Sequence, residues 1–175
     1  TEHVIAAMTR VGVSHLTLVS SLAVYDTSKV AIGAELTDTT PVVSTDTLRD
    51  TYSDAKAKQE ALALNAGFTS MTVLRPGIVY DAHHLWNAHL GAAVGPLLFS
   101  AAASDPLPMC HVQRCAAACV QTTVQRVHDT ITLVDPKLPT RRQVIAALQE
   151  TGWPKLVLPW PWRIVATAAR VLGPV

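Results

Sequence analysis

Apolar positions at the start of the chain recur with helical spacing. Residues 1–11 place Val4, Met8 and Val11 on one stripe of a helix. Gly12 follows directly, and glycine is a common residue just after the last turn of a helix. The pattern therefore predicts a first helix that ends before Gly12.

The next part of the chain alternates between strand and helix patterns. Residues 15–21 and 69–75 are short β-branched and apolar runs, which predict buried strands of the kind found in parallel sheets. Residues 50–66 are rich in Ala, Lys, Gln and Glu, and predict a helix that Gly67 ends. Residues 26–50 have little periodicity and predict a long loop. This order predicts a β-α-β unit with parallel pairing and a right-handed crossover.

The second half of the chain has weaker periodicity. It predicts a helix around 82–90, a loop over 96–108, a helix over 110–127, a strand over 130–134 and a helix that begins at 139–143. Thr140 and Gln143 have the spacing of a capping box at the start of that last helix. In the helix over 110–127, the positions expected to face inward are Ala116, Cys119, Val120 and Val124.

The tail predicts an amphipathic helix that begins near Trp162. Its apolar stripe consists of Val165, Ala168, Ala169 and Leu172. Basic residues opposite such a stripe are also typical of a helix that lies on a membrane surface. Because alanine is a weak membrane anchor, we expect instead that this helix packs on its own chain or on a partner subunit. The segment is too short to span a bilayer.

Composition narrows the class of protein. The chain has 175 residues with 49% apolar and 15% charged residues, which is typical of a globular protein. Its formal net charge is +1 and it has no cluster of Lys or Arg, so we expect no nucleic-acid partner. An odd number of cysteines, three, favours a reduced, cytoplasmic setting. The first residue is Thr1, so we expect the chain to begin partway through a larger protein.

Tyr52 and Lys56 form the first candidate for chemistry. They are four residues apart in the predicted helix, so both side chains lie on one face. A free tyrosine has a pKa of about 10, and a neighbouring lysine charge favours the phenolate. The pair would thereby become a general acid or base. The alternative is a solvated helix face without a chemical role.

Ser20 and Ser21 end the first predicted strand. Ligands of open parallel sheets bind beyond the carboxyl ends of the strands, so these hydroxyls are placed for chemistry. The alternative is that they only cap the following loop.

The histidines His83, His84 and His89 have a poor spacing for a metal site, and we expect no metal.

Three segments in a fixed order carry a family resemblance: residues 19–25 (VSSLAVY), Tyr52-x-x-x-Lys56 with Glu60, and residues 74–80 (LRPGIVY). Together with His111-Val112 and the Pro139-Thr140 helix start, this order resembles the extended short-chain dehydrogenase/reductases, the NAD-dependent epimerase/dehydratase family. The resemblance covers most of residues 1 to about 150. It implies an α/β fold, with a Rossmann-like parallel sheet and helices on both faces.

The resemblance also implies a division of the chain. Residues 1–81 would be the second half of a dinucleotide-binding domain that carries the catalytic residues. Residues 82–175 would be a small substrate-binding part, with one strand near 130–134 that returns to the sheet. The first, glycine-rich half of the dinucleotide-binding domain would be absent from this chain.

Site roles follow from the resemblance residue by residue. Ser21 would bind the reacting oxygen of the substrate, and Tyr52 would be the catalytic acid or base. Lys56 would hold the nicotinamide ribose and lower the tyrosine pKa. The cofactor contacts would be Ser20, Tyr52, Lys56, Pro76, Gly77 and Ile78.

Ligands follow from the same resemblance. The cofactor would be NAD or NADP, and the substrate a nucleotide sugar, a steroid or another carbonyl or hydroxyl compound. The helix that carries Tyr52 would be a candidate surface for a homodimer.

The sequence departs from the family in several places. Asp26 and Asp81 follow the two Val-Tyr pairs, where glycine is usual, and Gln113-Arg114 replace acidic residues after His-Val. No Gly-x-Gly-x-x-Gly or Gly-x-x-Gly-x-x-Gly occurs, so the turn that binds a dinucleotide pyrophosphate is missing from the sequence. Two hypotheses follow: an enzyme whose N-terminal half is not in this chain, or a non-catalytic scaffold that has lost cofactor binding.

Overall fold

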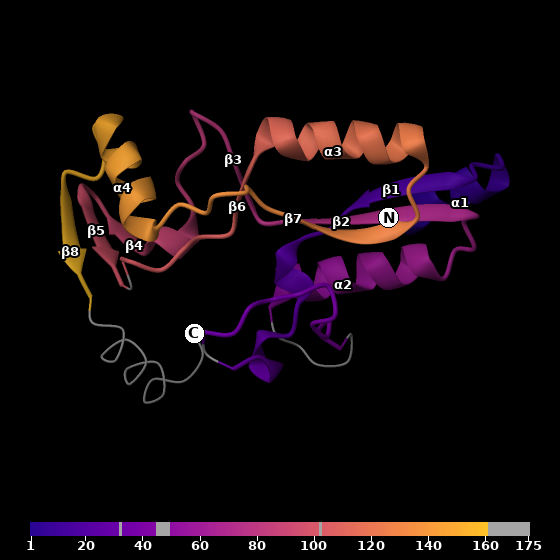
Figure 1. Cartoon of the computed structure of the whole chain (residues 1–175), viewed down its shortest axis with the longest axis horizontal. Helices are drawn as coiled ribbons and strands as arrows, with labels where there is room; N and C mark the ends of the chain where they lie inside the picture. The colour runs from indigo at the N-terminus through magenta and orange to yellow at the C-terminus, as the bar shows by residue number, and fades with distance from the viewer. Residues whose placement is uncertain (32, 45–49, 102, 161–175) are drawn as a thin grey trace. The chain divides into compact units, whose positions relative to one another are not determined.

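The computed structural model describes residues 1–31, 33–44, 50–101 and 103–160 (Figure 1). The chain divides into two compact units: residues 1–79 with 110–135, and residues 80–109 with the chain from Pro136 onward. This division differs from the predicted 1–81 and 82–175. The reason is that a helix as well as a strand between residues 110 and 135 belongs with the first unit.

The first unit is built on a parallel three-stranded sheet. Its strands are β1 (His15–Val19), β2 (Ser70–Pro76) and β7 (Asp129–Leu133), in the order β1-β2-β7. The register pairs Val19 with Leu74 and Leu74 with Ile131. The predicted parallel pairing is confirmed, and the strand near 130–134 joins β2 on the side away from β1.

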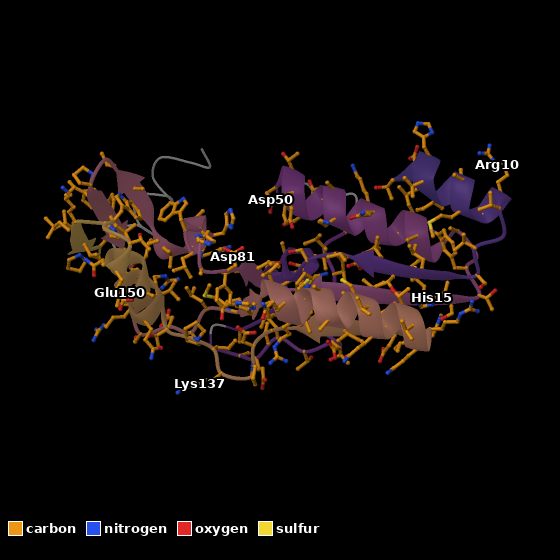
Figure 2. The ribbon with its side chains drawn as sticks, turned by 90° about the horizontal axis from the view of Figure 1, so that it is seen from above. Arg10, His15, Asp50, Asp81, Lys137 and Glu150 are labelled. Carbon is orange, nitrogen blue, oxygen red and sulfur yellow. The ribbon has the colours of Figure 1, made fainter. Side chains whose placement is uncertain are left out.

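Helices cover both faces of this sheet. The helices α1 (Glu2–Arg10) and α2 (Thr51–Leu64) lie on one face, and α3 (Val112–Gln125) lies on the other (Figure 2). Beneath α1 and α2, a core cluster joins helix and strand residues: Leu18, Ala63, Met71 and Val73, with Ile5 and Leu16 packed against them. The period-2 pattern of β1 and β2 places these residues on the α2 side.

Local side-chain chemistry fixes the start of α2. The carboxylate of Asp50, labelled in Figure 2, accepts hydrogen bonds from the Ser53 backbone N–H at 2.8 Å and from its hydroxyl at 2.7 Å. This cap satisfies an otherwise unpaired N–H of the first turn. Gly67 follows the helix with a φ of +74°. The predicted bounds of the helix are therefore right to within two residues.

The predicted inward face of α3 is wrong in part. Val120 and Val124 are 61% and 77% exposed, and Ala116 is also exposed. Instead, α3 contacts the sheet with its threonines: the Thr123 hydroxyl lies 2.8 Å from that of Thr17 on β1. An apolar stripe on α3 is thus uncovered within the described residues.

The second unit contains β4 (Ala92–Val94), β5 (Leu97–Ser100), β8 (Leu156–Pro159) and α4 (Arg141–Glu150). Strand β5 is central, antiparallel to β4 and parallel to β8. The predicted loop over 96–108 is therefore wrong at its start, because residues 97–100 form a strand, whereas the described residues from there to β6 are irregular. The predicted capping box at the start of α4 is confirmed, with Thr140 and Gln143 bonded reciprocally.

The predicted helix around 82–90 is also wrong. Only a 3₁₀ turn, η3 (Ala88–Leu90), forms there. The Asp81 carboxylate accepts hydrogen bonds from the backbone N–H groups of His83 and His84, both at 2.8 Å, and the Asn87 side chain accepts one from His89. Such side-chain bonds to nearby backbone compete with helix formation.

Short elements complete the chain. Two 3₁₀ helices, η1 (Leu22–Val24) and η2 (Thr27–Lys29), follow β1, and β3 (Ile78–Tyr80) pairs with β6 (Met109–His111). The predicted tail helix lies outside the described residues. Among the described helices, none has the length and apolar character needed to cross a membrane.

We predict that Gly91→Ala unfolds the second unit. Gly91 has a φ of +139°, and a Cβ there would lie 2.0 Å from the backbone oxygen of Phe99. The expected loss in free energy of unfolding is more than about 3 kcal/mol. Tryptophan fluorescence during urea unfolding measures it, because all four tryptophans are numbered within that unit.

The matched control is Gly95→Ala. Gly95 also has a positive φ, +55°, but a Cβ there meets nothing within 4 Å. It should cost only the strain of the left-handed backbone, about 1–2 kcal/mol. Equal losses for the two variants would show that the contact with Phe99 is not what requires glycine at 91.

Candidate functional site

The candidate site lies where β1 and β2 end. Val19 and Leu74 are paired neighbours, and the next residue, Ser20, donates its backbone N–H to the Leu74 oxygen at 2.7 Å. On the other strand, the Gly77 backbone N–H donates to the Leu133 oxygen at 3.0 Å. These bonds keep the serines after β1 and the Pro76-Gly77 turn at the same edge of the sheet, as predicted.

Lys56 reaches this edge from α2. Its ammonium donates hydrogen bonds to the backbone oxygen of Val19 at 3.0 Å and to the side chain of Gln59 at 3.2 Å. The first of these bonds places a positive charge at the last residue of β1. The structure therefore brings Lys56 together with the serine segment.

Tyr52 lies one helical turn before Lys56 and is 56% exposed. Its phenol has no hydrogen-bond partner among the described residues. An exposed phenol on this helix is accessible to a ligand.

The two serines differ in their surroundings. The Ser21 hydroxyl accepts a hydrogen bond from the backbone N–H of Ala23 at 3.2 Å and so caps η1. Ser20 is only 3% exposed, and within the described part of the chain its hydroxyl has no hydrogen-bond partner. Buried hydroxyls without partners are rare, so this one points to a group that is not part of these residues.

A buried ion pair lies directly behind the site. Arg75 donates from Nε to Glu60 Oε1 at 3.0 Å and from Nη2 to Glu60 Oε2 at 2.7 Å. The Arg75 guanidinium also stacks over the Tyr25 ring at 4.8 Å. Burial opposes the arginine charge, but the hydrogen bonds to Glu60 and Tyr25 outweigh it and raise the pKa of Arg75.

The Tyr25 hydroxyl extends this pair to β7 and the long loop. It lies 2.8 Å from the Thr132 hydroxyl, which donates to the Asp38 carboxylate at 2.6 Å.

Glu60 and Arg75 stood in the sequence motifs without an assigned role. The signal that could have found them is their placement: Glu60 continues the stripe of Tyr52 and Lys56, and Arg75 precedes the Pro76-Gly77 turn.

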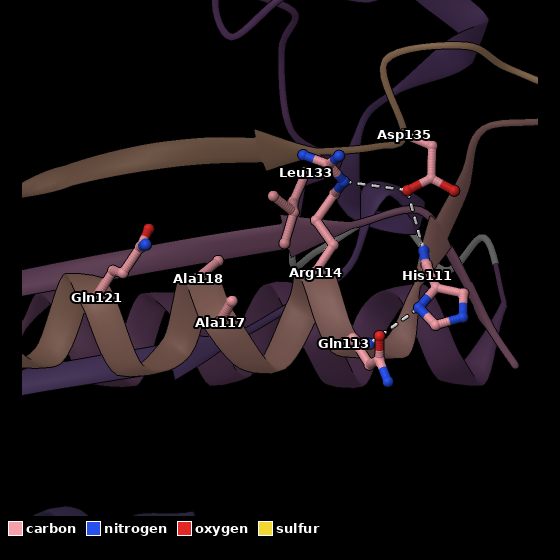
Figure 3. Close-up of a pocket in the computed structure, with 8 residues that line it drawn as sticks. All are labelled: His111, Gln113, Arg114, Ala117, Ala118, Gln121, Leu133 and Asp135. Atoms are coloured by element: carbon pink, nitrogen blue, oxygen red, sulfur yellow. Dashed lines mark hydrogen bonds and ion pairs between the residues drawn. The ribbon is translucent and has the colours of Figure 1, made fainter.

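A pocket of about 610 Å³ lies between α3 and the end of β7 (Figure 3). It is lined by His111, Gln113, Arg114, Ala117, Ala118, Gln121, Leu133 and Asp135. None of the predicted catalytic or cofactor-binding residues lines it. The pocket is therefore not the site that the sequence predicts.

Arg114, which departs from the family pattern, has a structural role at this pocket. The Asp135 carboxylate accepts a hydrogen bond from Arg114 Nε at 3.2 Å and another from the His111 backbone N–H at 3.1 Å (Figure 3). The ion pair of Arg114 and Asp135 therefore joins the start of α3 to the loop after β7.

The cysteines lie on β6 (Cys110) and on α3 (Cys115 and Cys119), and all three are free thiols. Burial raises the pKa of Cys110 to about 11, and it also raises the pKa of Cys115. Both groups are therefore protonated thiols near neutral pH, which is typical of core residues rather than of nucleophiles. No group of three or more His, Cys, Asp or Glu able to hold a metal ion occurs among the described residues.

Comparisons with known proteins find similarity in structure only. No family model and no curated protein matches the sequence. The UDP-Glc/GlcNAc 4-epimerase from Campylobacter jejuni matches with a TM-score of 0.68 and 15% identity, over 90% of this chain and 55% of its own. The UDP-glucose 4-epimerase from Thermus thermophilus, in complex with NAD, matches at 0.61 and 20%, over 90% and 54%.

A human epimerase family protein, SDR39U1, solved with NADPH, matches at 0.57 and 23%, over 88% and 51%. These matches show that the chain has the Rossmann-like fold of NAD-dependent epimerases and dehydratases, which confirms the fold class predicted from the sequence. The chain spans slightly more than half the length of these structures.

We predict that Ser20→Ala leaves the 175-residue chain as stable as before, or more stable by up to about 1 kcal/mol. The reason is that it removes a buried hydroxyl that has no partner among the described residues. Urea unfolding followed by circular dichroism measures the change.

Ser53→Ala is the control, because the Ser53 hydroxyl is equally buried but bonded to Asp50. It should cost about 1 kcal/mol or more. A loss at Ser20 as large as that at Ser53 would show that the Ser20 hydroxyl has a partner within the chain.

Proposed function

We propose that the chain is the catalytic part of an NAD(P)-dependent oxidoreductase or epimerase/dehydratase. The observation that carries this proposal is the end of β1, where the Lys56 ammonium lies on the Val19 oxygen and the next residue has a buried hydroxyl without a partner. A cation and an unpaired hydroxyl at a strand end fit a polar ligand, as expected for parallel sheets.

The residues divide the work as follows. Tyr52 gives a proton to, or takes it from, the reacting oxygen of the substrate, and Ser21 donates a hydrogen bond to the same oxygen. Lys56 would donate hydrogen bonds to the ribose of the nicotinamide nucleotide. When bound, NAD or NADP supplies or accepts the hydride. Ser20 and the turn of Pro76, Gly77 and Ile78 contact the cofactor.

A segment outside this chain completes the cofactor site in this proposal. Two observations support it. Strand β1 is at an edge of its sheet, and the Val120 and Val124 stripe of α3 is uncovered within the described residues. In addition, this chain spans slightly more than half the length of the similar structures, among which the Thermus thermophilus and human proteins were solved with NAD and NADPH.

The substrate class that we propose is a nucleotide sugar. The support is that two similar structures are epimerases named for UDP-linked sugars, and that a third similar structure, MoeE5, was solved with UDP-glucose and NAD. The second unit, from Tyr80 to Met109 and from Pro136, would then bind the sugar nucleotide. A homodimer through α2 stays a proposal, supported by the exposed Leu62 and Leu64.

A non-catalytic scaffold is the second candidate. The missing glycine-rich turn and the aspartates that replace glycine at 26 and 81 favour it. The two functions can be distinguished by experiment, because only the enzyme is expected to bind a dinucleotide and to transfer a hydride.

We predict that Tyr52→Phe, in the complete protein with any segment that precedes Thr1, lowers kcat by about 10²–10⁴-fold. The affinity for NAD or NADP should stay within about threefold, because the ring is kept and only the hydroxyl is lost. Steady-state kinetics and fluorescence titration measure the two quantities. Turnover of Tyr52→Phe close to that of the unchanged protein would rule out the phenol as the acid or base.

We also predict that residues 1–175 alone bind NAD(H) and NADP(H) negligibly, because this chain lacks the turn that holds the pyrophosphate. The complete protein should bind one of them with micromolar affinity. Isothermal titration calorimetry compares the two. Micromolar binding to residues 1–175 would place the cofactor elsewhere, and no binding to the complete protein would favour the scaffold.

A further inference from the structure

The elements of the proposed site all meet one network of side chains, in which the buried Tyr25, Glu60 and Arg75 continue through the half-buried Thr132 to the exposed Asp38. Glu60 is one helical turn beyond Lys56 and two turns beyond Tyr52 on the same stripe of α2. Arg75 directly precedes the Pro76-Gly77 turn. Tyr25 follows Ser21 by four residues, across the single turn of η1.

Side-chain packing alone does not fix where α2 lies along the sheet. The buried residues of this helix are small or polar: Ser53, Asp54, Ala57, Glu60 and Ala63. Its large apolar residues Leu62 and Leu64 are exposed. Helices are usually held in place by large apolar side chains that fit between those of a neighbour, and α2 buries no large apolar side chain.

The Glu60–Arg75 pair provides the missing constraint. Two parallel hydrogen bonds, at 3.0 and 2.7 Å, join a residue of the helix to the end of β2, and both residues are less than 8% exposed. A bidentate pair fixes the rotation of the helix as well as its distance from the strand. Stacking on Tyr25 holds the guanidinium in its plane.

Stability alone is a weak reason for such a pair. Replacing a buried ion pair with apolar residues of similar volume is often neutral or stabilising. Here the pair joins the element that carries Tyr52 and Lys56 to the element that carries the Pro76-Gly77 turn.

We propose that Glu60 and Arg75 are positioning residues: they hold Tyr52 and Lys56 in register with Ser21 and with the Pro76-Gly77 turn. This inference rests on the proposed function. A displacement of about 1 Å in a catalytic group can lower the rate by about 10²-fold. The network therefore affects the rate through the placement of other groups and touches no substrate itself.

The test uses the complete protein with two variants and one control. Glu60→Gln keeps the side-chain size but loses one acceptor of the pair. The double variant Glu60→Leu with Arg75→Met removes both charges together, which should keep stability within about 1 kcal/mol or raise it. Ala63→Gly is the control, because it loosens the same buried face of α2 without touching the pair.

The expected result is a split between rate and stability. Both variants of the pair should lower kcat at least 10-fold and leave KM within about threefold, whereas Ala63→Gly should keep kcat within about threefold. If the double variant folds and keeps nearly full kcat, the pair is only structural and the proposal fails. If the double variant does not fold, the kcat of Glu60→Gln is compared with that of Ala63→Gly. A Glu60→Gln variant that folds and keeps nearly full kcat would then refute the proposal.

A second readout separates this proposal from the proposed function. In NMR spectra of protein labelled at lysine and valine, a nuclear Overhauser effect should join the Lys56 ε-methylene to Val19, because the ammonium lies 3.0 Å from the Val19 oxygen. It should persist in Ala63→Gly and vanish in Glu60→Gln. A protein without hydride transfer would refute the proposed function, and loss or persistence of this signal would still decide whether the pair positions Lys56.

Discussion

A carboxylate and a guanidinium buried between α2 and β2 are the constraint on which the first unit depends. Removing two charges from water is costly, and a pair of this kind persists only with good geometry and further partners. Arg75 has both, with two hydrogen bonds to Glu60 and the face of Tyr25. Through Tyr25 the same network reaches Thr132 on β7. One side-chain network therefore connects α2, the strands β2 and β7, and the segment that follows β1.

The electrostatics of the site follow from this arrangement. Glu60 neutralises Arg75, so the arginine adds little net charge to the strand ends, and among the described residues Lys56 provides a positive charge at the end of β1. An ammonium at the last residue of β1 can donate hydrogen bonds to the hydroxyls of a sugar, as the proposed ribose contact requires, and it can equally bind a phosphate.

Much of the first unit could be predicted from the sequence, because its signals are local. Strands β1 and β2 have β-branched apolar runs, and α2 has helix formers between Asp50 and Gly67. The convergence of Ser20 and Lys56 was also predictable, because parallel strands end at one edge and helix stripes are regular.

The errors have non-local or competing causes. Strand β5 pairs with β8, almost 60 residues later, and a window of sequence around 97–100 contains no sign of that partner. The Asp81 side chain bonds the backbone of His83 and His84 and ends the helix pattern that begins there. The pairing of Arg75 with Glu60 could not be predicted either, because a glutamate within a charged helix is typical of a solvated face.

The most direct test of the account is a crystal structure of the complete protein with NAD(H) or NADP(H). The account predicts the nicotinamide ribose within about 3.2 Å of the Lys56 ammonium, the Ser20 hydroxyl in contact with the cofactor, and the Tyr52 phenol beside the nicotinamide ring. A dinucleotide bound away from the ends of β1 and β2, with the Ser20 hydroxyl still unpaired, would contradict it.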